Sequence, residues 1–322
     1  MNTAAEPTEL KNLARINAKG PDDLFICCAS FEERCLSSAA LMGRDFLTKY
    51  AVIFTIEEPL YQKQVEQNNF RLQTELRKKT TEGIFVISCQ RDNPLDGISQ
   101  LEKILGQARL NLETGPFITV DISGFTKIYL LELLHYLVTE KELGVPRMLH
   151  TTQRYLPTKL TRGIHQITTI PHYYGSPDMS KQTVFVPLLG FEPERALAVW
   201  KQFNPARTIA LITNPPRHGS DEYLKYARQN NADLLAQPNV EVRDMPADNP
   251  YGVKAVLDAI HEETKDGYNM VIGPFGTKPQ VVGVFLFCRE QRKVQVVYSY
   301  PATYTRSYLK RQPGETILLP AE

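Results

Sequence analysis

The sequence predicts an α/β protein: two tandem Rossmann-like domains, each built around a doubly wound parallel sheet and related by internal duplication. Short apolar runs rich in Val, Ile and Phe alternate with helical stretches along the chain, a pattern typical of parallel strands covered by helices on both faces. Four segments recur in the same order about 150 to 160 residues apart, as expected for a duplicated domain. The 322 residues are also enough for two domains.

The predicted strands are continuous apolar runs, and the predicted helices lie between them. Strands are expected near 24–29, 51–56, 84–88, 117–122 and 147–151, and again near 183–189, 208–213, 240–242, 268–273 and 294–298. Helices are expected over 32–49, 61–79, 95–110 and 127–142, and over 194–203, 221–237, 251–265 and 279–291. Such alternation implies right-handed crossovers within each sheet.

The recurring segments also predict the domain limits. The matched pairs are 24–34 with 183–195, 50–59 with 207–216, 92–94 with 248–250, and 117–127 with 268–278. We therefore expect one domain over 1–155, a connection containing Pro and Gly over 156–181, and a second domain over 182–322, the two related by an approximate twofold axis.

The composition excludes several classes of protein. Lys plus Arg number 37 and Asp plus Glu 36, so the net charge of +1 gives no strong signal for binding to duplex DNA or RNA. No apolar run approaches the roughly 20 residues of a membrane helix, and the N-terminus lacks the pattern of a signal peptide. Five unevenly spaced cysteines fit a reducing compartment. We expect a cytoplasmic protein without a membrane partner.

The first recurring polar element follows the first strand of each half. It reads Ser30-Phe-Glu-Glu-Arg34 in one half and Gly190-Phe-Glu-Pro-Glu-Arg195 in the other. The carboxyl edge of an open parallel sheet is where ligands bind, and Glu and Arg recur there together. The same residues also suit the start of a helix, so both interpretations stay open. In an enzyme, Glu32, Glu33 and Glu192 are candidate acid–base groups.

The second recurring element is Asp-Asn-Pro, which follows the third strand of each half. Asn93 and Asn249 are expected to cap the next helix. Either side-chain amide could instead bind a base or a ribose.

The third recurring element follows the fourth strand of each half. It includes Gly124, Thr126 and Lys127 in the first half, and Gly276, Thr277 and Lys278 in the second. Glycine allows the backbone to approach a ligand, and a helix N-terminus attracts an anion. A lysine there opposes the helix dipole, so its recurrence favours a phosphate-binding role over a plain cap.

This third element resembles the turn of the CARF domains, the CRISPR-associated Rossmann-fold sensors of cyclic oligoadenylates. Phe275-Gly-Thr-Lys-Pro279 is close to the Gly-Gly-Thr-Lys-Pro-like turn of that family, and Gly124-Phe-Thr-Lys127 is looser. The resemblance implies a nucleotide or cyclic oligonucleotide ligand and a role in antiviral defence. CARF proteins usually carry an effector domain. Two Rossmann-like domains use up this chain, so the resemblance implies an effector protein in trans.

Two alternatives to a sensor stay open. One is a hydrolase that cleaves a nucleotide, N-glycosidic or phosphodiester bond in the same cleft, for which Asp121 is a further candidate base. The other is a scaffold in which the recurring elements only cap helices. The motifs of metal sites, NAD or FAD sites and α/β-hydrolases are absent from the sequence, so we expect no cofactor and no metal.

Overall fold

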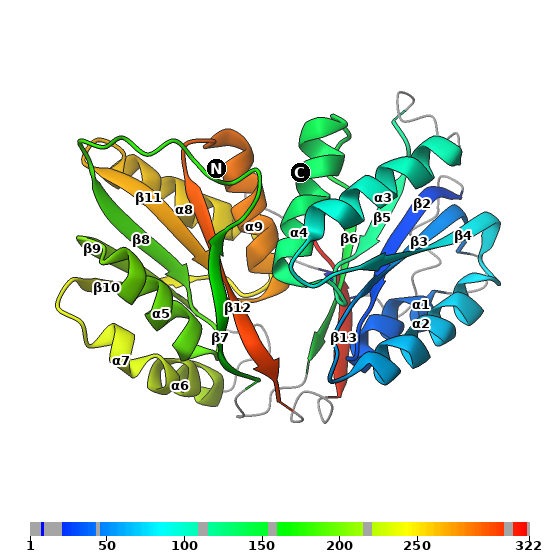
Figure 1. The fold of residues 1–322 in the computed structure, drawn as a ribbon, viewed down its shortest axis with the longest axis horizontal. Helices are drawn as coiled ribbons and strands as arrows, with labels where there is room; N and C mark the ends of the chain where they lie inside the picture. Colours follow the sequence, from blue (N-terminus) through cyan, green and yellow to red (C-terminus); the bar gives the residue numbers. More distant parts are fainter. Residues whose placement is uncertain are drawn as a thin grey trace. The chain divides into compact units, whose positions relative to one another are not determined.

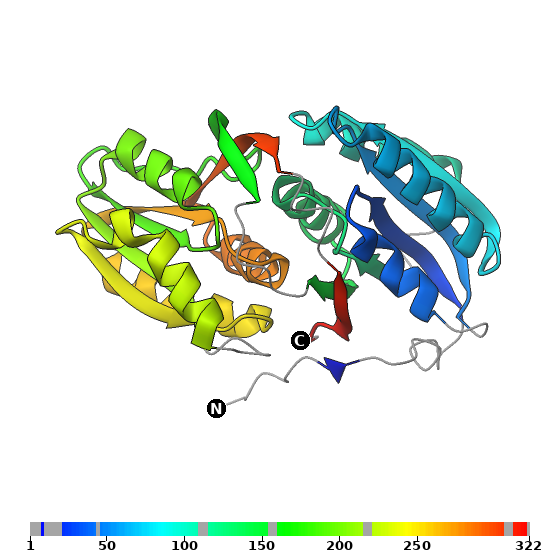
Figure 2. The same ribbon diagram turned by 90° about the horizontal axis from the view of Figure 1, so that it is seen from below.

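A computed structural model describes residues 8–9, 21–42, 46–108, 115–153, 160–214, 221–305 and 312–320, with the side chains of 8–9 and 221–223 excepted (Figure 1, Figure 2). The chain forms two compact units. The first unit holds the described residues of 5–154 and 309–322, and the second holds those of 155–308. Both units are α/β, as predicted.

The first unit has a seven-stranded sheet in the order β1-β13-β6-β5-β2-β3-β4. Strands β2 to β6 are parallel, whereas β13 runs antiparallel to β6 and to β1. The strands are β1 (Thr8–Glu9), β2 (Asp22–Ala29), β3 (Thr48–Ile56), β4 (Thr80–Cys89), β5 (Ile118–Asp121), β6 (Arg147–Gln153) and β13 (Pro313–Leu318). The helices are η2 (Glu33–Leu36), α1 (Ser37–Leu41), α2 (Gln62–Leu76), α3 (Pro94–Gln107), α4 (Lys127–Leu134) and the π-helix η4 (His135–Glu140).

The second unit has a six-stranded sheet in the order β10-β9-β8-β11-β12-β7, parallel except for β7. Its strands are β7 (Thr161–Thr169), β8 (Gln182–Leu188), β9 (Arg207–Thr213), β10 (Val240–Met245), β11 (Tyr268–Pro274) and β12 (Gln295–Tyr304). Its helices are α5 (Pro193–Phe203), α6 (Asp221–Asn230), α7 (Ala232–Leu235), α8 (Pro250–Thr264) and α9 (Lys278–Glu290).

The parallel strands follow the same order in both units: β6-β5-β2-β3-β4 corresponds to β12-β11-β8-β9-β10. This order confirms two Rossmann-like sheets. The recurring segments lie on corresponding elements, and their origin by duplication stays a prediction.

Strand exchange at the sheet edges differs from the expected division of the chain. Strand β7 lies within 156–181, which the sequence analysis assigns to a connection, and it pairs with β12. Strand β13 follows the second unit in sequence but pairs with β6 of the first. Strand β7 thus follows the last parallel strand of the first sheet but joins the second sheet. Strand β13 follows the last parallel strand of the second sheet but joins the first.

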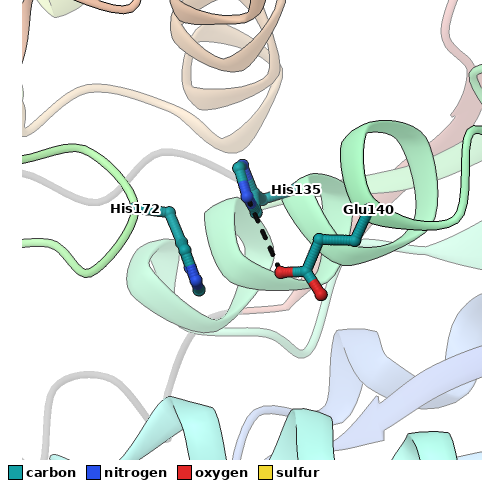
Figure 3. A group of neighbouring side chains, drawn as sticks. All are labelled: His135, Glu140 and His172. Carbon is teal, nitrogen blue, oxygen red and sulfur yellow. Dashed lines mark ion pairs between the residues drawn. The ribbon is translucent and has the colours of Figure 1, made fainter.

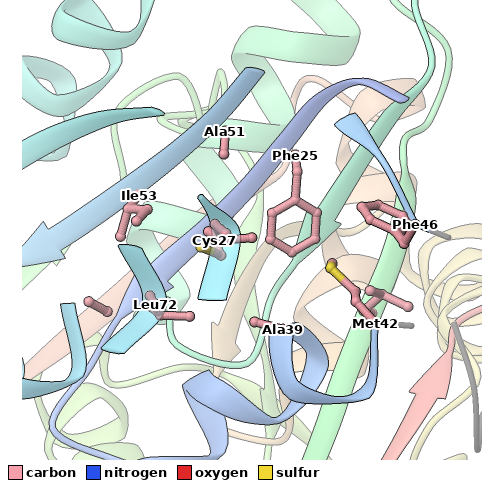
Figure 4. Close-up of a cluster of buried hydrophobic side chains, with 11 residues drawn as sticks. Phe25, Cys27, Ala39, Met42, Phe46, Ala51, Ile53 and Leu72 are labelled. Carbon is pink, nitrogen blue, oxygen red and sulfur yellow. The ribbon is translucent and has the colours of Figure 1, made fainter. Parts of the chain in front are cut away.

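Helices cover both faces of each sheet (Figure 1). In the first unit, α1 and α2 pack together on one face, and α3 packs with α4 on the other. Phe25, Cys27 and Ala29 of β2 point toward α1 and α2, where a buried cluster includes Phe46 and Leu72 (Figure 4). Successive strand residues face opposite helix layers, which is why β2 reads as a continuous apolar run.

The predicted helix over 32–49 is shorter in the structure. Residues 33–41 form η2 and α1, and β3 begins at Thr48, with the buried ring of Phe46 packed into the core before it. Among the described helices, none combines the length and the apolar character that a membrane crossing requires.

Candidate functional site

The topology of each sheet defines a switch point. From β2 the chain proceeds to β3 and β4 on one side, and then returns to β5 on the other. Strands β8 and β11 occupy the same two positions in the second unit. In open α/β sheets, ligands bind outside the carboxyl ends of the strands at this point. The first and third recurring elements follow these two strands in both units.

The two elements at each switch point are in close contact. A Cβ atom on Gly124 would lie 1.9 Å from the carbonyl oxygen of Cys28, at the end of β2. In the second unit, a Cβ atom on Gly190 would lie 2.4 Å from the carbonyl oxygen of Phe275. Both distances are far below van der Waals contact, so glycine is required at each position. In the first unit, the contact fixes the turn after β5 against β2, and in the second it fixes the turn after β8 against the turn after β11.

A buried asparagine, missed by the sequence analysis, holds the first element in each unit. Asn68 of α2 donates its amide to the carbonyl of Ser30 at 2.8 Å. Asn231, just before α7, donates to the carbonyl of Gly190 at 2.9 Å. The two asparagines are 4% and 1% exposed. The sequence gives only a weak signal for these bonds, because each joins an asparagine to a loop about 40 residues away.

In the first unit, the recurring acid and base form a partly buried pair. Arg34 Nη2 lies 3.0 Å from Glu32 Oε1, and the other carboxylate oxygen of Glu32 accepts a hydrogen bond from Gln153 at the end of β6. Glu33 points outward instead and lies 3.6 Å from Arg71 of α2. The hydroxyl of Ser30 accepts a hydrogen bond from the backbone N–H of Glu32. The loop is therefore tied to β6 by Glu32.

In the second unit, Arg195 is enclosed. It is 4% exposed, pairs with Glu192 at 3.1 Å and donates from Nε to the carbonyl of Ser299 at 2.7 Å. Its guanidinium lies 4.7 Å from the ring centroid of Tyr298 and 5.7 Å from that of Phe275. Within the described part of the chain, Arg195 Nη2, Glu192 Oε1 and Ser299 Oγ have no hydrogen-bond partner.

The electrostatics of Arg195 keep it charged. Burial alone would lower its pKa, but electrostatic interactions with Tyr298 and Glu192 outweigh burial, and the net pKa is raised. A permanently charged, stacked guanidinium with one unused donor is suited to hold an anion or a polar group.

The third element begins helices α4 and α9 as predicted. Thr126 and Thr277 are their N-caps, and Gln280 completes a capping box with Thr277. The Thr277 hydroxyl also donates to the carbonyl of Ala247 at 2.9 Å, so it already has partners in both directions. Lys127 and Lys278 are the first residues of their helices, and Lys278 is 8% exposed. A Cβ atom on Gly276 would lie 2.0 Å from Gln280 Oε1, within the capping box.

The second element does not belong to the switch points. Asn93 and Asn249 follow β4 and β10, the edge strands on the far side of each sheet. Each side chain caps its helix, accepting from Asp96 N at 3.4 Å and from Gly252 N at 3.0 Å. Both residues thus make the helix caps that the sequence analysis expects.

Asp121 is 1% exposed and lies in a buried network. Its carboxylate accepts hydrogen bonds from the hydroxyl of Ser38 and, at 2.8 Å, from the backbone N–H of Ser123. Ser123 Oγ accepts from Thr151 N at 2.7 Å, and the Thr151 hydroxyl pairs with that of Thr316 at 2.8 Å. These bonds tie α1, β5, β6 and β13 together, a structural role for the carboxylate.

Glu58 is a titratable group that the sequence analysis missed. It follows β3, is 6% exposed and lies 3.7 Å from Arg91. Burial raises its pKa, and Arg91 partly opposes that rise. A carboxyl group with a raised pKa at the carboxyl edge of a sheet is a candidate general acid.

The cysteines and the histidines His135 and His172 are the remaining groups of interest among the described residues. All five cysteines are buried, and burial raises the pKa of Cys35 to about 12, so its thiol stays protonated. Figure 3 shows an ion pair between His135 Nε2 and Glu140 Oε1 at 3.7 Å. Both residues lie in η4, whereas His172, also drawn, belongs to the other unit.

Comparison with known proteins identifies no family for this chain. No protein-family model matches it, and no curated protein is significantly similar. Among solved structures, the cytoplasmic domain of a prokaryotic cation chloride cotransporter is similar at 10% identity and a TM-score of 0.25, covering 87% of this chain and 96% of that chain. A similarity at that TM-score carries no argument about function.

Proposed function

We propose that the chain is a sensor that binds a nucleotide or cyclic oligonucleotide at the switch points of its two sheets. One observation carries the proposal: in both units, a Glu–Arg element and a Gly–Thr–Lys element follow the two strands that flank this point. The resemblance to CARF domains supports a role in antiviral defence, with an effector protein in trans.

The proposed roles follow from the chemistry of each group. Lys127 and Lys278 supply positive charge at helix N-termini, where backbone N–H groups also attract phosphate. The threonine caps fix the turns, and the glycines bring the backbone close to the neighbouring strand. Arg34 adds a guanidinium from the neighbouring loop of the first unit, and the enclosed Arg195 adds positive charge behind that loop in the second.

Thermal unfolding against a panel of nucleotides and cyclic oligonucleotides tests the proposal. Ligand at about a hundred times its dissociation constant adds roughly 2.7 kcal/mol to the free energy of unfolding. Lys127→Ala and Lys278→Ala should reduce that gain. Lys103→Ala and Lys201→Ala, exposed lysines on α3 and α5, serve as matched controls. A full panel without any shift would remove the nucleotide proposal and favour a scaffold.

The alternative is hydrolysis of the bound ligand, and Glu58 is the observation that favours it. Its raised pKa suits a proton donor, whereas Asp121 is enclosed. Mass spectrometry of the incubated ligand separates the two functions, because a sensor leaves the ligand intact. For an enzyme, Glu58→Gln should stop turnover and preserve binding.

A further inference from the structure

The first unit carries a cavity that does not include the Gly–Thr–Lys turn after β5. It has a volume of about 770 Å³, which lies in the usual range for small-molecule sites. It lies between α2 and the loop after β2. Its lining includes Phe31, Lys63, Gln64, Gln67 and Phe70.

Two aromatic rings line this cavity. Phe31 is 8% exposed, and its ring packs against that of Tyr61 with the centroids 4.8 Å apart, so its position is fixed. Phe70 is 70% exposed, although it lies in the middle of α2. An apolar ring held in water at the wall of a cavity is available for stacking on a planar ligand.

Amide groups stand beside the rings. Gln64 and Gln67 make no side-chain hydrogen bond to any residue that the structure describes, so their donors and acceptors are available to a ligand. Asn68 is fixed by its bond to the carbonyl of Ser30. Amide side chains offer a donor and an acceptor together, the combination that pairs with the edge of a nucleobase.

The lining of the cavity carries two cations, Lys63 and Arg71, and two carboxylates, Glu33 and Glu66. Lys63 makes no ion pair with the described residues. Arg71 is held by Glu33 at 3.6 Å, with both side chains more than half exposed. Among the described residues that line the cavity, Lys63 is therefore the cation available to an anionic group of the ligand.

We propose that this cavity binds a nucleoside monophosphate. The base stacks on Phe70 and Phe31, Gln64 and Gln67 bond to its edge, and Lys63 holds the phosphate. The site shares the loop after β2, with Phe31 and Glu33, but it uses neither Lys127 nor Lys278. Variants of these two lysines therefore distinguish it from the function proposed above.

Isothermal titration with AMP, GMP, CMP and UMP tests this site, with the matching nucleosides in parallel. Phe70→Ala should weaken binding about tenfold or more, since stacking on an aromatic ring contributes that much. Leu60→Ala is the control, because Leu60 is 61% exposed, precedes α2 and does not line the cavity. Lys63→Ala should weaken binding of the nucleotide and leave that of the nucleoside unchanged.

Two results would overturn the proposal: no binding of any of the four nucleotides at millimolar concentration, or equal affinities for the Phe70→Ala and Leu60→Ala variants. The Lys127→Ala/Lys278→Ala double variant separates the two sites. It should bind the nucleotides normally if they occupy this cavity. Loss of binding there, with Phe70→Ala unaffected, would assign the nucleotides to the switch points instead.

Discussion

The loop after the first strand lines a cavity in both units, but the two cavities lie against different elements, α2 in the first unit and the start of β7 in the second, and differ in size. The cavity has about 770 Å³ in the first unit and about 10 Å³ in the second, where Phe191, Glu192 and Leu160 are among its lining residues. The loops are held alike, by Asn68 and by Asn231. The same anchoring of the loop thus accompanies an open cavity beside α2 in one unit and an enclosed Arg195 beside β12 in the other.

The charged pairs show the same contrast. Arg195 is stacked between aromatic rings and bonded to β12. In the first unit it is the acid, Glu32, that contacts the last parallel strand, through Gln153. The same Glu and Arg pattern in the sequence therefore forms two different arrangements in the structure.

The largest expected effect distinguishes these pairs. Arg195→Ala should lower the free energy of unfolding by about 4 kcal/mol, because it removes the bond to Ser299 and the ring contacts of the guanidinium and also leaves the carboxylate of Glu192 without its partner. Arg34→Ala should cost about 1 kcal/mol, since Glu32 keeps its bond to Gln153. Urea unfolding of each variant, monitored by hydrogen exchange in each unit, measures both losses of free energy of unfolding. Equal losses would contradict the contrast.

Close backbone approach should produce the next largest effect. Gly124→Ala should destabilise the first unit by about 3 kcal/mol and Gly190→Ala the second by about 2 kcal/mol, because each new methyl group overlaps a carbonyl oxygen. Gly106→Ala is the control. Nothing lies within 4 Å of its Cβ position in α3, so alanine should stabilise the helix slightly. Thermal unfolding gives all three values, and neutral Gly124→Ala and Gly190→Ala variants would show that the loops do not pack as described.

Removal of the buried asparagines should have similar effects in the two units. Asn68→Ala and Asn231→Ala should each cost about 1 to 3 kcal/mol, because the carbonyl of Ser30 or Gly190 loses its donor. Chemical denaturation of the two variants checks the values. A loss of stability for only one of the two variants would show that the two asparagines do not stabilise their loops equally.

The smallest effect concerns pH. Since burial raises the pKa of Glu58, ionisation of this carboxyl opposes folding at neutral pH. Glu58→Gln should therefore stabilise the first unit at pH 7. The gain should shrink as the pH falls through the raised pKa, and vanish below the pKa of an unfolded glutamate, where both states are protonated. Thermal unfolding between pH 4 and pH 8 tests the trend, and a gain that grows on acidification would contradict it.

Local patterns predicted most of the fold. The ten apolar runs correspond to the ten parallel strands, and Asn93 and Asn249 cap helices as their Asn-Pro sequences indicate. Strands β7 and β13 were not predicted, because their sequences are of mixed polarity and they pair with partners far away in the chain.

The candidate site was predicted only in part. The loops and turns at the switch point follow from strand order and recurrence. The contacts of Glu32 with Gln153 and of Arg195 with Ser299 join residues more than 100 positions apart. The cavity beside α2 depends on which face of that helix stays exposed. Neither feature has a local signature in the sequence.

The most direct measurement is hydrogen exchange of the whole chain with and without the nucleotide or cyclic oligonucleotide that gives the largest thermal shift. Ligand binding at the switch points predicts slower exchange in residues 30–34 and 123–127 of the first unit, and in 190–195 and 274–278 of the second. Protection confined to α2 and residues 30–34, or to other segments, with 123–127, 190–195 and 274–278 unchanged, would contradict the central claim.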